Sequence, residues 1–230
     1  MFNRLTRVGA GFVVGIVGVF ALASGASAFP LVSGDNTETC AFISPAAGSG
    51  QCHIQTVTAH PAWMPDNGLN ATWISYGPTG YQDAGPYAPR DPNLPLIRVT
   101  ETFTLTLPSL LNIAIWADDT AEVFINGISV FAPNFTQSIC ANGSIGCEPD
   151  ELGQISQLLA IGTHTVSFDV FQIGTGTNTA SNPFGLLYTG SVEVFGTGTN
   201  VTVSEAPGVS VALAGLLGFG LAARRRRKMH

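Results

Sequence analysis

Two adjacent aspartates, Asp118 and Asp119, are the side chains whose types and spacing come closest to a chemical site. Paired carboxylates act as a general acid and base in many enzymes, and carboxylate oxygens are also ligands that calcium prefers. Neighbours on a strand point to opposite faces, so the pair can serve one site only if the chain turns there. Turn initiation and backbone capping are the simpler interpretation. We keep both as candidate ligand-binding residues, with no required cofactor and with calcium as a compatible one.

Three tryptophans offer flat aromatic faces of the kind on which pyranose rings stack. Core packing is the usual role of tryptophan in a β-sandwich, so it is the alternative for each of them. Trp73 and Trp116 join the two aspartates as candidate ligand-binding residues. The histidines are scattered along the chain, and packing or capping explains them better than metal ligation.

The sequence contains no recognisable catalytic motif. It has no G-x-S-x-G nucleophile elbow, no H-E-x-x-H zinc motif, no Walker A loop and no dinucleotide-binding fingerprint. An exported hydrolase is the remaining catalytic alternative, and it lacks an identifiable nucleophile and acid/base pair. We therefore expect a protein that is not an enzyme.

Four cysteines, Cys40, Cys52, Cys140 and Cys147, are expected to form disulfides if the chain is exported. Four cysteines allow three pairings. We prefer the sequence-local one, Cys40 with Cys52 and Cys140 with Cys147, which closes two short loops rich in glycine and serine. A zinc site is disfavoured because the sequence has no C-x-x-C pair.

The first 28 residues have the features of a secretory signal peptide. Arg4 and Arg7 give a positive start, residues 8–23 are apolar and uncharged, and Ala26-Ser27-Ala28 fits the A-x-A cleavage pattern. We predict cleavage between Ala28 and Phe29. An uncleaved N-terminal anchor is the alternative.

The C-terminal segment carries a cluster of cations behind an apolar stretch. Residues 208–223 are uncharged, and five cations follow them: Arg224, Arg225, Arg226, Arg227 and Lys228. Such cations stay on the cytoplasmic side while the preceding segment lies in the bilayer. At ~1.5 Å per residue, residues 209–223 span about 22 Å, short of the roughly 30 Å hydrocarbon core. A transient stop in the membrane is therefore favoured over permanent anchorage.

This tail resembles the PEP-CTERM sorting signal. Glu205 and Pro207 match that motif, with Ala206 between them and Ser204 where the family usually has its first proline. The resemblance implies an exosortase-like processing enzyme as a partner, transient membrane contact through the tail, and a membrane-anchored precursor. It also implies export through the inner membrane of a Gram-negative bacterium to the cell surface or the extracellular matrix. An ordinary C-terminal membrane anchor is the alternative.

The exported part of the chain is strongly acidic. Between Phe29 and Pro207 only Arg90 and Arg98 oppose all fifteen acidic residues, so the net charge is about −13. This charge argues against binding to nucleic acid, which needs a basic face. It also argues against adhesion to anionic lipid through a basic patch, and it is compatible with calcium.

Alternating segments predict several short strands with turns between them. Threonines alternate with apolar or acidic residues over 100–107, and apolar residues alternate with others over 111–117 and 164–170. Further strands are expected at 54–59, 71–76 and 186–195, whereas 152–161 fits either a helix or a strand. Residues 29–52, 61–95 apart from 71–76, and 132–153 are expected to be irregular.

Asn126-Gly127 predicts a two-residue type I′ hairpin, because both positions of that turn need a positive φ. The predicted register pairs Ile125 with Ile128 and Val123 with Val130.

Together these elements predict an all-β protein, an antiparallel β-sandwich flanked by an N-terminal signal helix and a C-terminal apolar helix. Residues 72–188 resemble the galactose-binding-like jelly roll. The resemblance lies in Trp73-Ile74-Ser75, in Phe103-Thr104-Leu105, in residues 116–127 with their A-D-D and N-G motifs, and in residues 162–166. The expected domains are a signal peptide at 1–28, a β-sandwich at 29–200 with its core at about 72–195, and a linker with the sorting tail at 201–230.

Two functions follow from these expectations. The first is an exported, non-catalytic surface or extracellular-matrix protein that is sorted by its tail and associated with exopolysaccharide or biofilm. The alternative is a carbohydrate-binding module, with or without calcium. Both have polysaccharide as a candidate partner, and neither involves nucleic acid.

Overall fold

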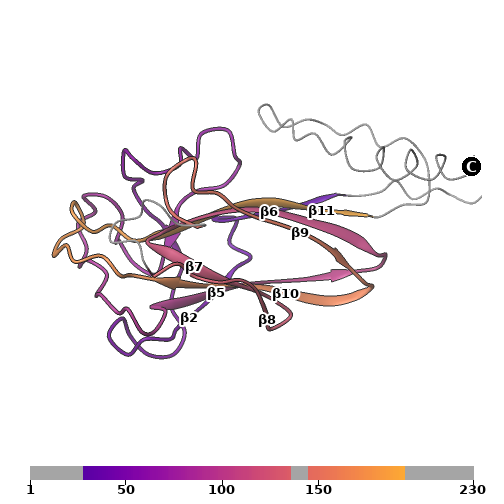
Figure 1. Cartoon of the computed structure of the whole chain (residues 1–230), viewed down its shortest axis with the longest axis horizontal. Coiled ribbons are helices and arrows are strands. Elements are labelled where there is room, and N and C mark those ends of the chain that lie inside the picture. Colours follow the sequence, from indigo (N-terminus) through magenta and orange to yellow (C-terminus); the bar gives the residue numbers. More distant parts are fainter. Residues whose placement is uncertain (1–27, 136–144, 195–230) are drawn as a thin grey trace, which may run out of the picture. The chain divides into compact units, whose positions relative to one another are not determined.

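The computed structural model describes residues 28–135 and 145–194, and these residues form two antiparallel β-sheets packed face to face (Figure 1). One sheet has six strands: β1 (Phe29–Val32), β3 (Gln55–Thr56), β4 (Ile74–Ser75), β6 (Ser109–Asp118), β9 (Gly153–Leu159) and β11 (Gly185–Val194). The other has five: β2 (Thr39–Phe42), β5 (Ile97–Leu105), β7 (Thr120–Ile125), β8 (Ile128–Phe131) and β10 (Gly162–Phe171). The predicted all-β sandwich is thus confirmed for this part of the chain.

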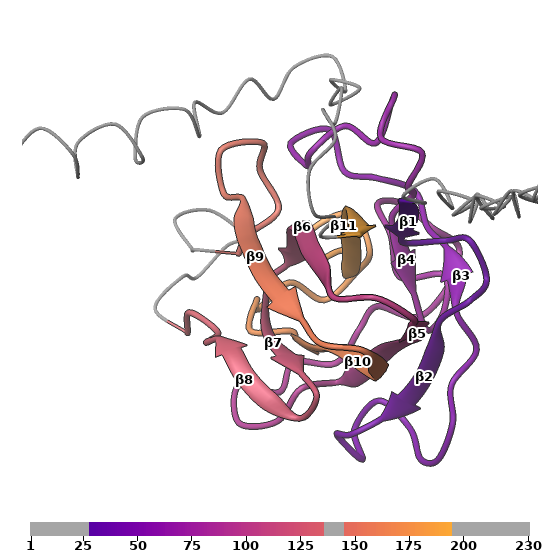
Figure 2. The same cartoon turned by 90° about the vertical axis from the view of Figure 1, so that its right-hand side faces the viewer.

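Long strand pairs form the centre of each sheet. In the first sheet the order is β3-β4-β11-β6-β9, with β1 also paired to β11, and in the second it is β2-β5-β10-β7-β8. Figure 2, which looks along the strands, shows the two sheets as separate layers. The chain passes from the first sheet to the second between β6 and β7, at Asp118 and Asp119.

The main core lies between the sheets and follows the predicted alternation. On β6 the side chains of Leu111, Ile113 and Ile115 are at most 3% exposed and belong to this core. The alternate residues Ala114 and Trp116 belong instead to a second apolar cluster on the outer face of the six-stranded sheet. That cluster also contains Trp63 and Trp73, so connections between the early strands cover this face.

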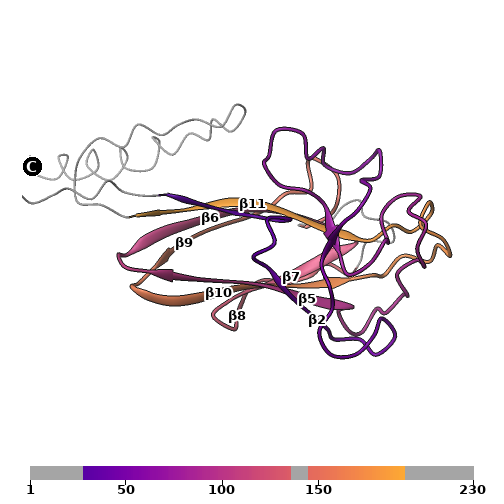
Figure 3. The same ribbon diagram turned by 180° about the vertical axis from the view of Figure 1, so that it is seen from behind.

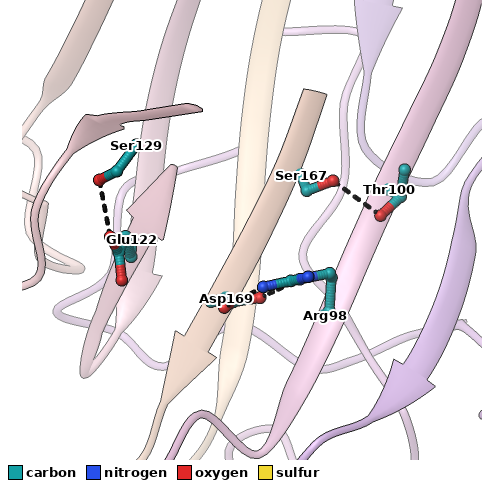
Figure 4. A network of polar contacts seen from close by, with 6 residues as sticks. All are labelled: Arg98, Thr100, Glu122, Ser129, Ser167 and Asp169. Atoms are coloured by element: carbon teal, nitrogen blue, oxygen red, sulfur yellow. Dashed lines mark hydrogen bonds and ion pairs between the residues drawn. The ribbon is translucent and has the colours of Figure 1, made fainter. Parts of the chain in front are cut away.

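The outer face of the five-stranded sheet is polar (Figure 4). Arg98 on β5 donates two hydrogen bonds to Asp169 on β10, at 2.6 and 2.7 Å, and its guanidinium lies 5.1 Å from the centre of the Phe124 ring. The hydroxyl groups of Thr100 on β5 and Ser167 on β10 form the next hydrogen bond between the same two strands. Because this face is solvated, the strands of this sheet alternate between core and solvent.

The long connections gather at one end of the sandwich, which we call the loop end. Strands β6 and β10 finish there, and β5 and β11 begin there (Figure 3). The other end has only short turns between β5 and β6 and between β9 and β10. We call it the turn end.

The expectation of irregular structure at 29–52 is wrong, because β1 and β2 lie in this segment. Each is only four residues long and forms by pairing with a long strand, β1 with β11 and β2 with β5. Their own residues show no alternation that sequence periodicity could detect. Residues 153–159 of the ambiguous segment form the strand β9.

The predicted hairpin is present, with one change in its register. Asn126 and Gly127 have φ angles of 53° and 78°, and Ile125 pairs with Ile128 as predicted. Val123, however, pairs with Phe131 rather than Val130, because the ladder is irregular between Val123 and Phe124. A β-bulge of this kind shifts the register by one residue.

The predicted disulfide between Cys40 and Cys52 is confirmed. Cys147 is also disulfide-bonded, and its predicted partner Cys140 lies outside the described residues. The signal peptide, the sorting motif and the flanking helices are also outside them. Within 28–135 and 145–194, no helix has the length and apolar character needed to cross a membrane.

Candidate functional site

A pocket of about 230 Å³ opens at the loop end, and both candidate aspartates line it. Its walls come from connections far apart in the sequence: the segment around Trp63, the β6–β7 junction, the segment at 147–148, and the β10–β11 connection. The lining residues are His60, Ala62, Trp63, Asp118, Asp119, Cys147, Glu148, Gly174, Thr175, Gly176, Ala180, Ser181, Asn182 and Pro183.

Asp118, the last residue of β6, is held against the tryptophan cluster. Its Oδ2 accepts a hydrogen bond from Trp63 Nε1 at 2.8 Å, and the residue is only 4% exposed. The Trp63 ring lies 4.2 Å from the Trp73 ring, which is fully buried beneath it. The tryptophan cluster therefore forms a rigid support on which Asp118 rests.

Asp119 fixes the β10–β11 connection. Its Oδ2 accepts hydrogen bonds from the backbone amides of Ile173 and Gly174, at 2.6 and 2.7 Å. The peptide bond between Asp118 and Asp119 is cis. Since the chain changes sheets here, both carboxyl groups reach one pocket, and the capping role foreseen for this pair is present in Asp119.

The two carboxyl groups also hydrogen-bond to each other, and both have raised pKa values. Burial is the main cause for Asp118, whose pKa is well above its usual range, and the nearby charge of Asp119 raises it further. Burial also raises the pKa of Asp119, while the hydrogen bonds from Asp118 and from the two amides oppose this shift. Two buried carboxyls in contact share a proton rather than both ionising.

This geometry does not match that of a glycoside hydrolase. Retaining enzymes separate their two carboxyl groups by ~5 Å and inverting enzymes by more. Asp118 and Asp119 are in hydrogen-bond contact instead. The pair is suited to accept or donate hydrogen bonds to a ligand, and it leaves no room for a sugar or a water between its members.

Asn182 is a pocket residue that the sequence did not single out. It is 6% exposed, and its Nδ2 has no hydrogen-bond partner within the described part of the chain. The glycine-rich segment packs closely beside it, since a Cβ on Gly174 would collide with Asn182 Oδ1 and one on Gly176 would lie 2.6 Å from Asn182 Cβ. A buried amide without a partner is costly, so a ligand that accepts its hydrogen bond would be bound favourably.

The other two sequence candidates lie beneath the pocket. Trp73 is fully buried and donates to the Met64 carbonyl, and Trp116 is 3% exposed with no partner for its Nε1 among the described residues. Neither presents a free ring face, which agrees with the core-packing interpretation. They hold Trp63 in place and do not form a stacking surface.

A second acidic cluster lies away from the pocket. Asp35, Glu38 and Glu101 place one carboxylate oxygen each within 4.8 Å of one another. Glu101 is buried and also accepts hydrogen bonds from Tyr188 at 2.5 Å and Thr37 at 2.9 Å, whereas Glu38 Oε2 is buried without a partner among the described residues. Carboxylates in this arrangement fit calcium better than the proton-sharing pair does.

No protein-family model and no curated protein matches the chain. Among solved structures, a family 35 carbohydrate binding module from Clostridium thermocellum matches with 8% identity over 71% of this chain and 97% of its own, at a TM-score of 0.35. CBM35 from Paenibacillus barcinonensis matches with 10% identity, 74% and 99% coverage and a TM-score of 0.31. The GH26-CBM35 β-(1,4)-mannanase of Podospora anserina matches with 10% identity and a TM-score of 0.33, over 76% of this chain but 29% of its own. No ligand or reaction can be transferred at such identities and TM-scores.

Proposed function

We propose that this chain is an exported, non-catalytic protein whose β-sandwich binds carbohydrate in the pocket at the loop end. The supporting observation is the buried amide of Asn182, whose Nδ2 has no partner among residues 28–135 and 145–194, in a pocket that also contains a carboxyl pair. Sugar hydroxyls both donate and accept hydrogen bonds, so one hydroxyl satisfies the amide while its neighbour donates to a carboxylate.

The size and walls of the pocket favour a single sugar unit or a chain end. At about 230 Å³ it is smaller than the ~300–1,000 Å³ of typical drug-sized sites. Trp63 supplies one apolar wall, and Thr175 and Ser181 add hydroxyl groups. A few polar groups in fixed positions beside an aromatic wall are typical of small-molecule recognition.

The acidic surroundings favour a neutral sugar over a uronic acid. Asp118, Asp119 and Glu148 line the pocket, and no arginine or lysine does. A ligand carboxylate would therefore lie among acidic groups, with no cation among the lining residues to pair with it. Neutral exopolysaccharide is the ligand class that the pocket suits best.

The location belongs to the same proposal and depends on the ends of the chain. The signal peptide and the PEP-CTERM-like tail would direct the protein through the inner membrane to an exosortase-like enzyme. Intact-mass spectrometry of the native protein tests this: a mass that begins at Phe29 and ends near Pro207 supports processing. A mass that still contains Arg224 to Lys228 would make the tail an anchor instead.

Binding is tested by a glycan array followed by isothermal titration calorimetry on the full-length protein. Asn182→Ala should weaken binding of the selected glycan roughly ten-fold, since it removes one buried hydrogen bond to the ligand, from an Nδ2 that makes none to the described residues. Asn112→Ala is the matched control, because Asn112 lies on β6 outside the pocket and should leave the affinity unchanged. An array with no bound glycan would remove the proposal and leave a surface protein without sugar recognition.

Calcium support is tested by thermal unfolding of the same protein. If the acidic cluster of Asp35, Glu38 and Glu101 holds calcium, a chelator should lower the melting temperature of the domain. Glu38→Gln should remove that response. A melting temperature that does not change with chelator or with added calcium would contradict a role for the ion.

A further inference from the structure

The turn end of the sandwich exposes three large apolar side chains, Leu107, Leu158 and Ile161, which we call the apolar tip. Leu107 lies in the β5–β6 turn and is 46% exposed, while Leu158 and Ile161 lie at the β9–β10 turn and are 56% and 62% exposed. Both turns are visible at the right-hand end of the sandwich in Figure 1. None of these side chains contributes to the pocket at the opposite end.

Strand register shows that the two turns are neighbours. Leu105 and Ser109 flank the first turn, and they pair with Gly162 and Leu159, which flank the second. The exposed residues in and beside the turns are therefore contiguous. The segments 102–117 and 152–168 that build this end contain no Asp, Glu, Lys or Arg, and their one histidine, His164, is 8% exposed. Glu193 on the neighbouring strand β11 pairs with Leu110.

The chain leaves the sandwich at the same end. Val194, the last residue of β11, pairs with Ser109, so the row of Val194, Ser109 and Leu159 runs across the sheet beside both turns. Beyond Val194 the sequence runs through residues 195–207 to the apolar stretch 208–223 and the five cations. A chain of about 13 residues with random-coil dimensions has a root-mean-square end-to-end distance of about 20 Å.

We propose that the apolar tip contacts the lipid bilayer that holds the C-terminal tail. A membrane reached through this linker lies closest to the turn end, and exposed apolar side chains gain free energy by leaving water there. The exported part is otherwise acidic, and anionic lipid repels it. The apolar tip, whose two turns contain no Asp, Glu, Lys or Arg, is the surface that can approach such a membrane. The inference rests on the proposed membrane tail and does not depend on sugar binding.

This contact would orient the domain. The pocket lies at the loop end, and the strands run between it and the apolar tip. With the tip on the lipid, the pocket opens away from the membrane, towards extracellular glycans.

The test uses the full-length protein in vesicles of phosphatidylethanolamine and phosphatidylglycerol that contain doxyl-labelled lipid. Leu107→Trp places a fluorescent reporter in the apolar tip. Leu94→Trp is the matched control, because Leu94 is 43% exposed and precedes β5 at the loop end. The three native tryptophans are at most 3% exposed and give a shielded background. We expect the lipid quencher to reduce the emission of L107W and to leave that of L94W unchanged.

Three outcomes would overturn the proposal. They are equal quenching of both variants, no quenching of L107W in vesicle-bound protein, and absence of the full-length protein from floated vesicles. A blue-shifted L107W emission without vesicles, together with a dimer in sedimentation, would assign the tip to a second copy of the chain instead. Calorimetry with the glycan on the same L107W sample tests the pocket separately, so failure of one proposal does not imply failure of the other.

Discussion

At the scale of single residues, the main feature of this domain is that several acidic side chains are buried. Asp118, Asp119 and Glu101 are at most 4% exposed, and burial raises the pKa of each. Each finds hydrogen-bond donors: Trp63, two backbone amides, and the pair Tyr188 and Thr37. These donors make buried acids tolerable in a domain with almost no cations.

The raised pKa of Asp118 predicts how stability depends on pH. Folded Asp118 keeps its proton at pH values above the unfolded pKa of ~3.9, where the unfolded side chain loses it. Its contribution to the free energy of unfolding is therefore present at low pH and is lost as pH rises through the folded pKa. Each unit of pKa difference contributes about 1.4 kcal/mol. Asp118→Asn should reduce the loss of unfolding free energy between pH 4.5 and pH 7.5, measured by urea denaturation.

Asp150→Asn is the control for that measurement, because it makes the same chemical change at an exposed position. A wild-type protein that becomes steadily more stable over this pH range, with D118N following the same curve, would contradict the assignment.

Removing the hydroxyl of Tyr188 should destabilise the core. Tyr188 is fully buried, its ring stacks on Phe168 at 4.5 Å, and its hydroxyl donates to Glu101. Tyr188→Phe keeps the ring but leaves a buried carboxyl oxygen without its donor, at a cost of about 1–3 kcal/mol in chemical denaturation. Tyr76→Phe should change stability by far less, because the Tyr76 hydroxyl makes no hydrogen bond within the described residues. Equal effects of the two changes would count against the Glu101 contact.

At the scale of elements, local turn chemistry decides the β7–β8 hairpin, whereas long-range pairing decides the edge strands. Asn126 and Gly127 adopt the positive φ angles that their types allow, and Asn126 also exchanges hydrogen bonds with Thr165 on β10. Strands β1 and β2 depend on β11 and β5 for their hydrogen bonds. The disulfide between Cys40 and Cys52 ties β2 to the segment that follows it.

Gly127→Ala should destabilise the hairpin by about 1–2 kcal/mol, because an alanine at φ 78° has its Cβ close to the next carbonyl oxygen. A Cβ at Gly127 would meet nothing else within 4 Å, so backbone conformation is the whole effect. Gly77→Ala is the matched control, since Gly77 has no positive φ and only an ordinary contact at 3.9 Å. Thermal unfolding followed by circular dichroism measures both variants. An unchanged melting temperature for G127A would show that the turn does not need glycine at this position.

At the scale of the whole molecule, the two ends of the sandwich differ in chemistry. The loop end holds the acidic pocket, whereas the turns at the other end expose apolar side chains and contain no Asp, Glu, Lys or Arg. The strands that join them are long and continuous, so the two ends are held apart by a rigid core. Because the two ends are held apart, the proposed sugar site and the proposed membrane contact face in opposite directions.

The net charge of the chain between Phe29 and Pro207 predicts a preference among glycans. A domain with about −13 charges repels anionic polysaccharide, and salt screens this repulsion. A neutral glycan should therefore bind more tightly than its uronic-acid counterpart at low salt, and the difference should narrow at high salt. Titration of matched neutral and acidic oligosaccharides at two ionic strengths measures it. Tighter binding of the acidic member at low salt would point to a bound cation in the pocket.

The sequence by itself determined the features that depend on near neighbours. Alternation predicted β5, β6 and β10, because a sheet with one buried face imposes a period of two on each strand. The Asn126-Gly127 hairpin and the disulfide between Cys40 and Cys52 were predictable for the same reason, since their partners are close along the chain. From the sequence, Asp118 and Asp119 can share a site only if the chain turns there. The chain does change direction there, and both side chains line the pocket.

Only the tertiary structure decided which residues meet in the pocket. Trp63, Asp118 and Asn182 are separated by many residues and come from different connections, so no local pattern links them. The strands β1 and β2, and the burial of Trp73 and Trp116, likewise follow from packing against distant segments. A strand or turn is set by local energetics, whereas a site assembled from loops exists only after the sheets have brought those loops together.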